Sequence, residues 1–330
     1  MPKVSSLTVY PVKGLKGIEL QQAKVTRTGL RFDRNWMVVD ARSGQFITQR
    51  EMPRLALIST HLPLELLTGE WGAASAEAAL TLSTAAPVSS SVQIPLDGSL
   101  LEDSNKRECR CWSWEGPAQD QGNEAADWLS DFLGSSVRLM RYTGQPDWQS
   151  NAGHDSTRAR RQVDPSWLQF APEDEIAFQD NFPILMASEG GLAALNSHLE
   201  HPVPMNRFRP NLVVDDRSFW AEDTWEAIEF HSASSPDPNA TESNLKLRLA
   251  APASRCSVTT VNQTTAERGK EPLRTLGKIR RGKQLGWTLR PEWKPAAFFG
   301  WNVVPLREGL IAVGDDVEVL GQRSITSLSA

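Results

Sequence analysis

Alternation between apolar and polar residues dominates the first hundred positions of the chain. The stretches SSLTVYPVKG and KVTRTG alternate and end in glycine, and further short alternating runs recur between residues 61 and 100. A period of two is typical of half-buried strands. The stretch NWMVVDARSGQFITQR places two β-rich runs around Ser43 and Gly44, which predicts a hairpin. We therefore expect this part of the chain to be mainly β.

Helical spacing first appears in NEAADWLSDFLG, which predicts a helix capped by Asn123 and ended by Gly134. A second helix is expected after the buried strand FPILMA, with Ser188 as its cap. Gly190 and Gly191 leave its first turn without side chains. That bare turn suits either a bound phosphate, held by free N–H groups, or a tight strand-to-helix junction. The pattern leaves both interpretations open.

The last third of the chain returns to strand-like patterns. Between the two β-rich parts, residues 144–175 are polar and rich in proline, aspartate and arginine, which is typical of a domain boundary or an active-site lid. Two β-rich barrels with a few covering helices account for this order, so the predicted fold class is α+β and mainly β. The predicted late strands are RPNLVV, WEAIEF, LKLRLA, CSVTTV and IAVGDDVEVLG.

Charge and hydropathy narrow the functional classes. The 330-residue chain has a formal net charge of −5, which argues against general nucleic-acid binding. No stretch approaches the roughly 18 consecutive apolar residues that a membrane span requires, and the N-terminus lacks a signal-peptide core. We therefore expect a soluble, cytoplasmic protein without a transmembrane segment. The motifs GxxxxGK[ST], GxGxxG, HExxH and GxSxG are absent from the sequence.

Only three cysteines occur, so a disulfide framework is not expected. Cys109 and Cys111 would share one face of a strand, where buried and unreactive side chains are the simpler interpretation. Cys256 follows Ser254 and Arg255 at the expected start of a strand. A neighbouring guanidinium favours thiolate over thiol, so Cys256 is a candidate nucleophile or metal ligand. A buried and inert cysteine is the alternative.

Three short basic clusters point to an anionic ligand. Each alone is typical of a surface ion pair. Two arginines that flank an aromatic residue on a strand would point to one side, which suits a bidentate grip on phosphate. Taken together, the clusters predict a compact anionic ligand. They are YPVKGLKG with Lys13 and Lys16, RFDRNW with Arg31 and Arg34, and MNRFRPN with Arg207 and Arg209.

These segments also carry a resemblance to a known family. In its order of motifs the chain resembles the MOSC-domain molybdenum proteins, and within them the amidoxime-reducing components, over about residues 5–322. The segments that carry the resemblance are YPVKG, FDRNWMVVD, AFQDNFPILMASEGGLAALN, NRFRPNLVV, EDTWE, SRCSVTTVNQTTAERGKEPLRTL, FGWNVVP and GLIAVGDDVEVLGQ.

The resemblance implies a domain organisation and a cofactor. It implies N-terminal strands at residues 1–34 that contribute to the cofactor site and a MOSC N-terminal β-barrel domain at 35–142. A MOSC domain at 143–322 and a tail at 323–330 would follow. It also implies one molybdenum cofactor, with the metal ligated by Cys256.

Further site residues follow from the same resemblance. Asp180 matches an aspartate near the metal that could relay protons or orient a substrate N–OH group. Gly14 and Asn181 belong to the expected site but depart from the animal relatives, in which serine stands at the first position and a Thr-Ser pair replaces Asn181 and Phe182. The resemblance assigns the grip on the pterin and its phosphate to Lys13, Arg34, Arg209, Asn211, Ser254 and Arg255.

The function implied by the resemblance is the reduction of N-hydroxylated compounds such as amidoximes, N-hydroxyguanidines and hydroxylamine, and of nitrite to nitric oxide. Cytochrome b5 with its NADH-dependent reductase, or nitrate reductase, would supply the electrons. The basic stretches RARR (158–161) and KIRRGK (278–283) are candidate docking patches for such a donor. The alternatives are a non-catalytic cofactor carrier or sulfur-transfer module, and an oxidoreductase that uses another metal at the cysteine.

Overall fold

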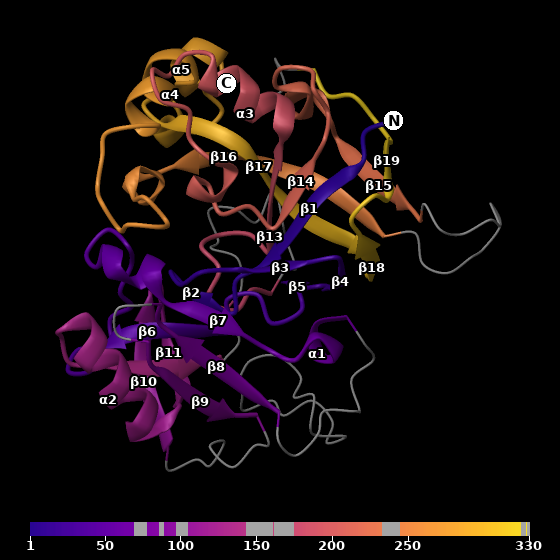
Figure 1. The fold of residues 1–330 in the computed structure, drawn as a ribbon. Helices are drawn as coiled ribbons and strands as arrows, with labels where there is room; N and C mark the ends of the chain where they lie inside the picture. The colour runs from indigo at the N-terminus through magenta and orange to yellow at the C-terminus, as the bar shows by residue number, and fades with distance from the viewer. Residues whose placement is uncertain are drawn as a thin grey trace.

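The computed structural model describes residues 1–68, 78–85, 89–96, 105–142, 161, 175–232, 245–324 and 328. These residues form mainly strands with a few covering helices, which confirms the predicted fold class (Figure 1). No described helix is long and apolar enough to cross a membrane. The α-helices are α1 (Leu64–Thr68), α2 (Gly122–Leu133), α3 (Glu189–Asn196), α4 (Leu273–Ile279) and α5 (Gly282–Leu285).

The largest sheet has eight strands and joins the two ends of the chain. Two strands from the N-terminus form one edge of it, and β1 pairs antiparallel with β14 through Leu7 and Leu212. All the other strands come from the second half of the sequence. In spatial order the sheet contains β19 (Asp316–Val319), β15 (Ala227–His231), β16 (Lys246–Arg255), β17 (Ala297–Arg307), β13 (Ile184–Ser188), β14 (Leu212–Val214), β1 (Val4–Val9) and β3 (Ile18–Leu20).

The N-terminal segment also joins a second sheet, because β2 (Val12–Lys13) pairs in parallel with β6 (Trp36–Asp40). The chain therefore passes from one sheet to the other and back within its first twenty residues. This five-stranded sheet continues through β12 (Val137–Arg141), β11 (Trp114–Asp120) and β10 (Lys106–Cys111). The two three-stranded sheets contain β18 (Gly309–Ala312), β4 (Gln22–Thr26) and β5 (Gly29–Leu30), and β7 (Ser59–His61), β8 (Ala79–Ser83) and β9 (Ser91–Pro95).

One continuous apolar core supports both halves. It includes Val9 and Leu55 from the first part of the chain and Leu249 and Trp301 from the last part, each at most 1% exposed. Burial on this scale is the main favourable term in folding, so the two halves stabilise each other. The domain boundary expected near residue 142 adjoins residues outside the described ranges and stays a prediction.

The predicted local elements are largely present, with small shifts. The hairpin turns at Gly44, whose φ is 67°, although its return arm forms only a bridge between Phe46 and Val39. Helix α2 ends at Gly134 as predicted, but it begins before Asn123. The Asn123 side chain accepts a hydrogen bond from Arg138 at 3.0 Å instead of capping the helix. The expected lid at 144–175 lies outside the described residues, apart from residues 161 and 175.

Candidate functional site

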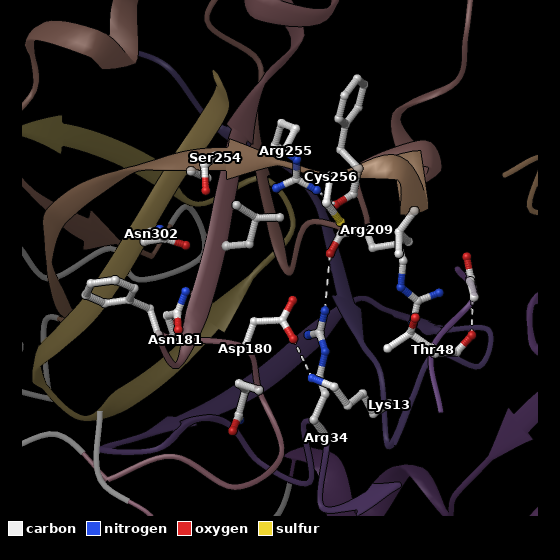
Figure 2. A pocket seen from close by; sticks show the side chains of 18 of the residues that line it. Lys13, Arg34, Thr48, Asp180, Asn181, Arg209, Ser254, Arg255, Cys256 and Asn302 are labelled. Atoms are coloured by element: carbon white, nitrogen blue, oxygen red, sulfur yellow. Dashed lines mark hydrogen bonds and ion pairs between the residues drawn. The ribbon is translucent and has the colours of Figure 1, made fainter. Parts of the chain in front are cut away.

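A cavity of about 270 Å³ opens where the two halves of the chain meet. Its walls come from the loop after β2, the hairpin turn between β10 and β11, the loop before β13 and the end of β16. Figure 2 shows Lys13, Asp180 and Cys256 around this space. The structure brings all the site residues that the resemblance implied into this one cavity. They are Lys13, Gly14, Arg34, Asp180, Asn181, Arg209, Asn211, Ser254, Arg255 and Cys256.

Cys256 lies directly after strand β16, not at the start of a strand. The following residues Ser257–Thr260 form a 3-10 turn, so the predicted strand CSVTTV is wrong. The threonine hydroxyls explain the difference, because Thr259 and Thr260 donate back to the carbonyls of Cys256 and Ser257 at 2.9 and 2.7 Å. The turn leaves the Cys256 thiol exposed in the cavity beside Arg255 and Arg209 (Figure 2).

Two arginines that line the cavity, Arg34 and Arg209, enclose the buried ring of Tyr10. The guanidinium carbons of Arg34 and Arg209 each lie 4.3 Å from the ring centroid of Tyr10. Burial lowers the pKa of Arg209 to about 10, although the Tyr10 charge opposes that shift. A π face between two cations attracts both, so the ring holds two like charges close together in a low-dielectric site.

The backbone of both arginines is strained. Arg34 and Arg209 have φ values of 51° and 55°, in the left-handed region that costs a non-glycine residue about 1–3 kcal/mol. Hydrogen bonds from Arg34 to Asp33 at 2.6 Å, and from Arg209 to the Leu15 carbonyl at 2.6 Å, hold the strained conformation. Strain maintained by surrounding contacts is common at functional sites.

The strand expected to align Arg207 with Arg209 is absent, and this expectation is wrong. A 3-10 helix at Met205–Arg207 followed by the turn at Arg209 sends the two guanidiniums to different places. Arg207 donates to the carbonyls of Thr259 and Glu271 at 2.8 Å, so it braces the turn after the cysteine instead of lining the cavity. Neither Arg31 nor Lys16 lines the cavity.

Arg255 lies next to the cysteine, and only some of its hydrogen-bond donors have partners. It donates to the Phe208 carbonyl at 2.7 Å, while its buried Nε has no hydrogen-bond partner. Burial lowers the pKa of the guanidinium, and the charge of Cys256 raises it in opposition. An unpaired buried N–H is unfavourable, so this side chain is suited to an additional anionic group.

Asp180 faces the cavity from the opposite wall. Its carboxylate forms an ion pair with Lys13 (Figure 2). It also accepts a hydrogen bond from Trp112 Nε1 at 3.0 Å. The Lys13 charge and the hydrogen bonds from Lys13 and Trp112 hold the pKa of Asp180 well below its usual range. The side chain is nevertheless 66% exposed, which leaves an ionised carboxylate open to a ligand.

Trp112 is a site residue that sequence reasoning missed. It occupies the turn between β10 and β11 with φ 58°, and its ring packs against Phe46 at 4.9 Å and beneath the Arg50 guanidinium at 4.9 Å. Tyr10 was missed as well. Neither carried a usable signal, because the partners of Trp112 at Asp180 and of Tyr10 at Arg209 are far away in the sequence.

The remaining expected residues contribute in different ways. The amide of Asn211, which is 2% exposed, donates to the Thr8 carbonyl and to Asp33 Oδ1 at 3.1 and 2.8 Å. Its Oδ1 accepts from the Leu185 N–H at 3.1 Å, so its polar atoms are engaged within the protein. The Gly14 carbonyl accepts a hydrogen bond from Gln49 at 2.6 Å. The side chains of Asn181 and Ser254 line the cavity.

The N-terminus of α3 is packed and leaves no space for an anion. Ser188 caps the helix as predicted, accepting from the Gly191 N–H at 2.9 Å, and donates to Glu222 at 2.6 Å. The Gly190 N–H donates to the Asp216 carbonyl at 2.8 Å, and a Cβ at Gly190 would lie 2.3 Å from a backbone oxygen of Ser218. The tight-junction interpretation therefore applies to this helix.

The sequence predictions for the other two cysteines and for the two basic stretches had different outcomes. Cys109 and Cys111 are fully buried on one face of β10, as predicted, and burial raises the pKa of Cys109 to about 12. Arg161 is buried and donates to the Ala177 and Gln179 carbonyls, so it is not part of a docking patch. The rest of RARR, residues 158–160, lies outside the described ranges. Within KIRRGK, Arg280 is buried in an ion pair with Asp223.

Comparison with known families agrees with this architecture. The MOSC N-terminal beta barrel domain matches residues 1–136, and the MOSC domain matches residues 173–318. The chain belongs to the family of MOSC-domain proteins, which confirms the resemblance identified from the sequence.

Two named relatives are similar over almost the whole chain. Mitochondrial amidoxime-reducing component 1 of Homo sapiens is 32% identical, and the match covers 97% of this chain and 83% of the relative. Mitochondrial amidoxime reducing component 2 of Bos taurus is 30% identical, with 95% and 82% covered.

Proposed function

We propose that this protein is a molybdenum-cofactor-dependent reductase of N-hydroxylated compounds. The observation that carries the proposal is the cavity itself, in which the exposed Cys256 thiol shares one space with several cations and the ionised Asp180. The names of the relatives point to amidoximes as the substrate class. N-Hydroxyguanidines and hydroxylamine contain the same N–O bond, and nitrite is a further proposed substrate.

The donor set of the cavity fits the proposed cofactor. Lys13, Arg34, Arg209 and Arg255 supply cationic donors for an anionic pterin phosphate, and the unpartnered Nε of Arg255 agrees with a missing anionic neighbour. A thiolate at Cys256 suits a soft, redox-active metal. When bound, that group supplies two-electron redox chemistry at molybdenum, between Mo(IV) and Mo(VI).

The protein's own residues bind and orient the substrate. Asp180 stays ionised at neutral pH, so it accepts hydrogen bonds from a substrate N–OH or N–H group and is a poor proton donor. Lys13 and Trp112 fix the position of that carboxylate. In the overall reaction the substrate takes up two electrons and two protons, its N–O bond breaks, and water leaves with the amine or amidine.

The electrons come from a separate donor in this proposal. Cytochrome b5 reduced by its NADH-dependent reductase is the first candidate, and nitrate reductase is the second. The cytoplasmic location expected from the sequence is also proposed here. The similar relatives carry mitochondrial names, so fractionation of the native cell provides the direct test.

Metal analysis followed by turnover tests this function. The purified protein is expected to contain molybdenum and pterin in equal amounts and to reduce benzamidoxime when electrons are supplied. Cys256→Ala should retain the fold, because the thiol is exposed, yet lose molybdenum and activity. Cys109→Ala, at a buried cysteine away from the cavity, is the matched control and should retain both.

Either of two experimental results would replace the proposed function with one of the alternatives. Tight cofactor binding without turnover would favour a carrier or sulfur-transfer module, for which an exposed thiol is equally suited. A stoichiometric metal other than molybdenum would favour a different oxidoreductase.

A further inference from the structure

The segment after the cysteine concentrates positive charge on the surface of a protein whose net charge is −5. Between residues 262 and 283 the chain exposes six cationic side chains, while its only carboxylates are Glu267 and Glu271. Among the described residues none of these six cations forms an ion pair with a carboxylate. We call this set the basic stripe; its members are Arg268, Lys270, Arg274, Lys278, Arg281 and Lys283.

The basic stripe begins at the mouth of the cavity. Arg268 donates to the carbonyls of Arg50 and Glu51, the second at 3.2 Å, and Arg50 lines the cavity. The Gly269 N–H donates to the Thr260 carbonyl at 2.9 Å, which ties the stripe to the turn that follows Cys256. The stripe therefore extends from the edge of the proposed metal site outward along the surface.

Helix α4 orders the middle of the basic stripe. Arg274 and Lys278 are four residues apart and exposed, so they project from the same face of the helix. The opposite face is anchored, because Leu276 is fully buried and the Glu271 carboxylate accepts the Thr275 N–H at 3.0 Å. The Arg207 guanidinium joins this segment to the turn after Cys256 through the Glu271 and Thr259 carbonyls. The cations thus lie on a fixed surface.

We propose that the basic stripe is the docking surface for an acidic electron-donor protein. The inference rests on the proposed reductase function, because each turnover consumes two electrons that must reach the cavity. Charge complementarity steers such transient encounters and raises their rate by about 10- to 1000-fold at low salt. A positive surface that starts at the cavity mouth places an acidic partner beside the proposed redox centre.

Charge reversal tests the docking surface. The double variant Arg274→Glu, Lys278→Glu, assayed as holoenzyme with the haem domain of cytochrome b5, should raise the KM for that donor by about tenfold and flatten its salt dependence. Its rate with dithionite-reduced methyl viologen, a small reductant, should stay at the wild-type value. A wild-type KM for the donor protein would overturn the inference.

The matched control carries the same charge change elsewhere. Arg27→Glu, Arg307→Glu alters two exposed arginines, one directly after β4 and one at the end of β17 that leads into β18. Both strand ends lie on the side of the molecule away from α4 and α5 (Figure 1). This variant should leave the KM for the donor protein unchanged. An equal rise in both variants would show that net charge alone is responsible and would contradict a defined surface.

Direct binding separates this inference from the proposed function. If neither electron source supports turnover, the reductase proposal fails, and calorimetric titration of the wild-type protein with the cytochrome domain still tests the docking surface. Weaker binding of Arg274→Glu, Lys278→Glu would support it, and equal binding would contradict it. Binding to vesicles of anionic phospholipid in place of the cytochrome would overturn it in favour of a membrane surface.

Discussion

At the scale of single residues, Tyr10 explains how two arginine side chains can share one largely buried region with the ring between them. Each guanidinium faces the ring at 4.3 Å, and each backbone is held in the left-handed region. A cation over a desolvated ring gains about 2 kcal/mol, so the ring offsets part of the repulsion and strain. The positions of the two arginines therefore depend on a residue whose own side chain is almost fully buried.

Replacing that ring should weaken cofactor retention. Tyr10→Leu removes both ring contacts, and the molybdenum content of the purified protein should fall at least about tenfold, as 1.4 kcal/mol of lost binding implies. Tyr10→Phe keeps the π face and should remain close to wild type. Equal molybdenum contents in the two variants would contradict this role.

Asp180 gives a prediction about pH. The pKa of Asp180 is held below the usual range, so the carboxylate is ionised throughout pH 5–8. Any stability that its ion pair gives the folded protein is present above the pKa of aspartate in the unfolded chain and is lost only in acid. Activity between pH 5 and 8 should therefore show no titration of this group. Asp180→Asn should lower kcat/KM about 100-fold across that range. A strongly pH-dependent defect in this variant would indicate proton transfer by Asp180 instead of orientation.

Sequence reasoning found the residues of the site that lie in short motifs and missed those that depend on distant contacts. Lys13 and Cys256 stood out by their chemistry and local sequence, Asp180 was implied by the family resemblance, and all three line the cavity. Trp112 reaches Asp180 across 68 positions, and no local pattern encodes that hydrogen bond. The prediction that Arg207 and Arg209 share one face of a strand was wrong for the same reason. The left-handed turn at Arg209 is stabilised by the Leu15 carbonyl, which is distant in the sequence.

At the scale of elements, alternation predicted strands well wherever apolar residues met the core. It failed at CSVTTV, since threonine hydroxyls compete there for backbone carbonyls and favour a 3-10 turn. The start of α2 shifted for a similar reason, because Asn123 is engaged by Arg138. Side-chain contacts of this kind decide element boundaries, and a pattern of hydropathy does not contain them.

The packed junction at the start of α3 should make the stability of the folded protein depend on pH. Burial raises the pKa of Glu222 to about 7, the neighbouring Asp223 adds to the shift, and the Ser188 hydrogen bond and Arg280 oppose it. The folded protein therefore binds a proton that the unfolded chain, with a glutamate pKa near 4.5, has released. This contribution to stability is full below about pH 4.5 and is lost as pH rises to about 7.

The variant Glu222→Gln tests the direction of this pH dependence. The amide has no proton to lose, so the part of the unfolding free energy that falls between about pH 5 and 7, of order 1–3 kcal/mol, should disappear in this variant. Urea denaturation at several pH values measures it. A wild-type pH profile in the variant would show that another group is responsible.

At the scale of the whole molecule, Asn211 links three segments beneath the cavity. Its side chain joins the N-terminal strand at Thr8, the Asp33 carboxylate that also binds Arg34, and the backbone at Leu185. Asn211→Leu would remove all three of these buried hydrogen bonds and should lower the unfolding free energy by about 3–5 kcal/mol. Retained stability, measured by chemical denaturation, would contradict this account.

The pairing of β1 with β14 determines when the cavity can form during synthesis of the protein. Strands β1 and β3 form one edge of a sheet whose other strands begin only at Ile184 and are therefore translated much later. The cavity between the halves therefore forms only after residues from Lys13 to Asn302 have been translated, and a prosthetic group would have to be inserted after that point. Cells starved of molybdenum should accordingly accumulate complete, folded and empty protein that regains activity when the supply returns.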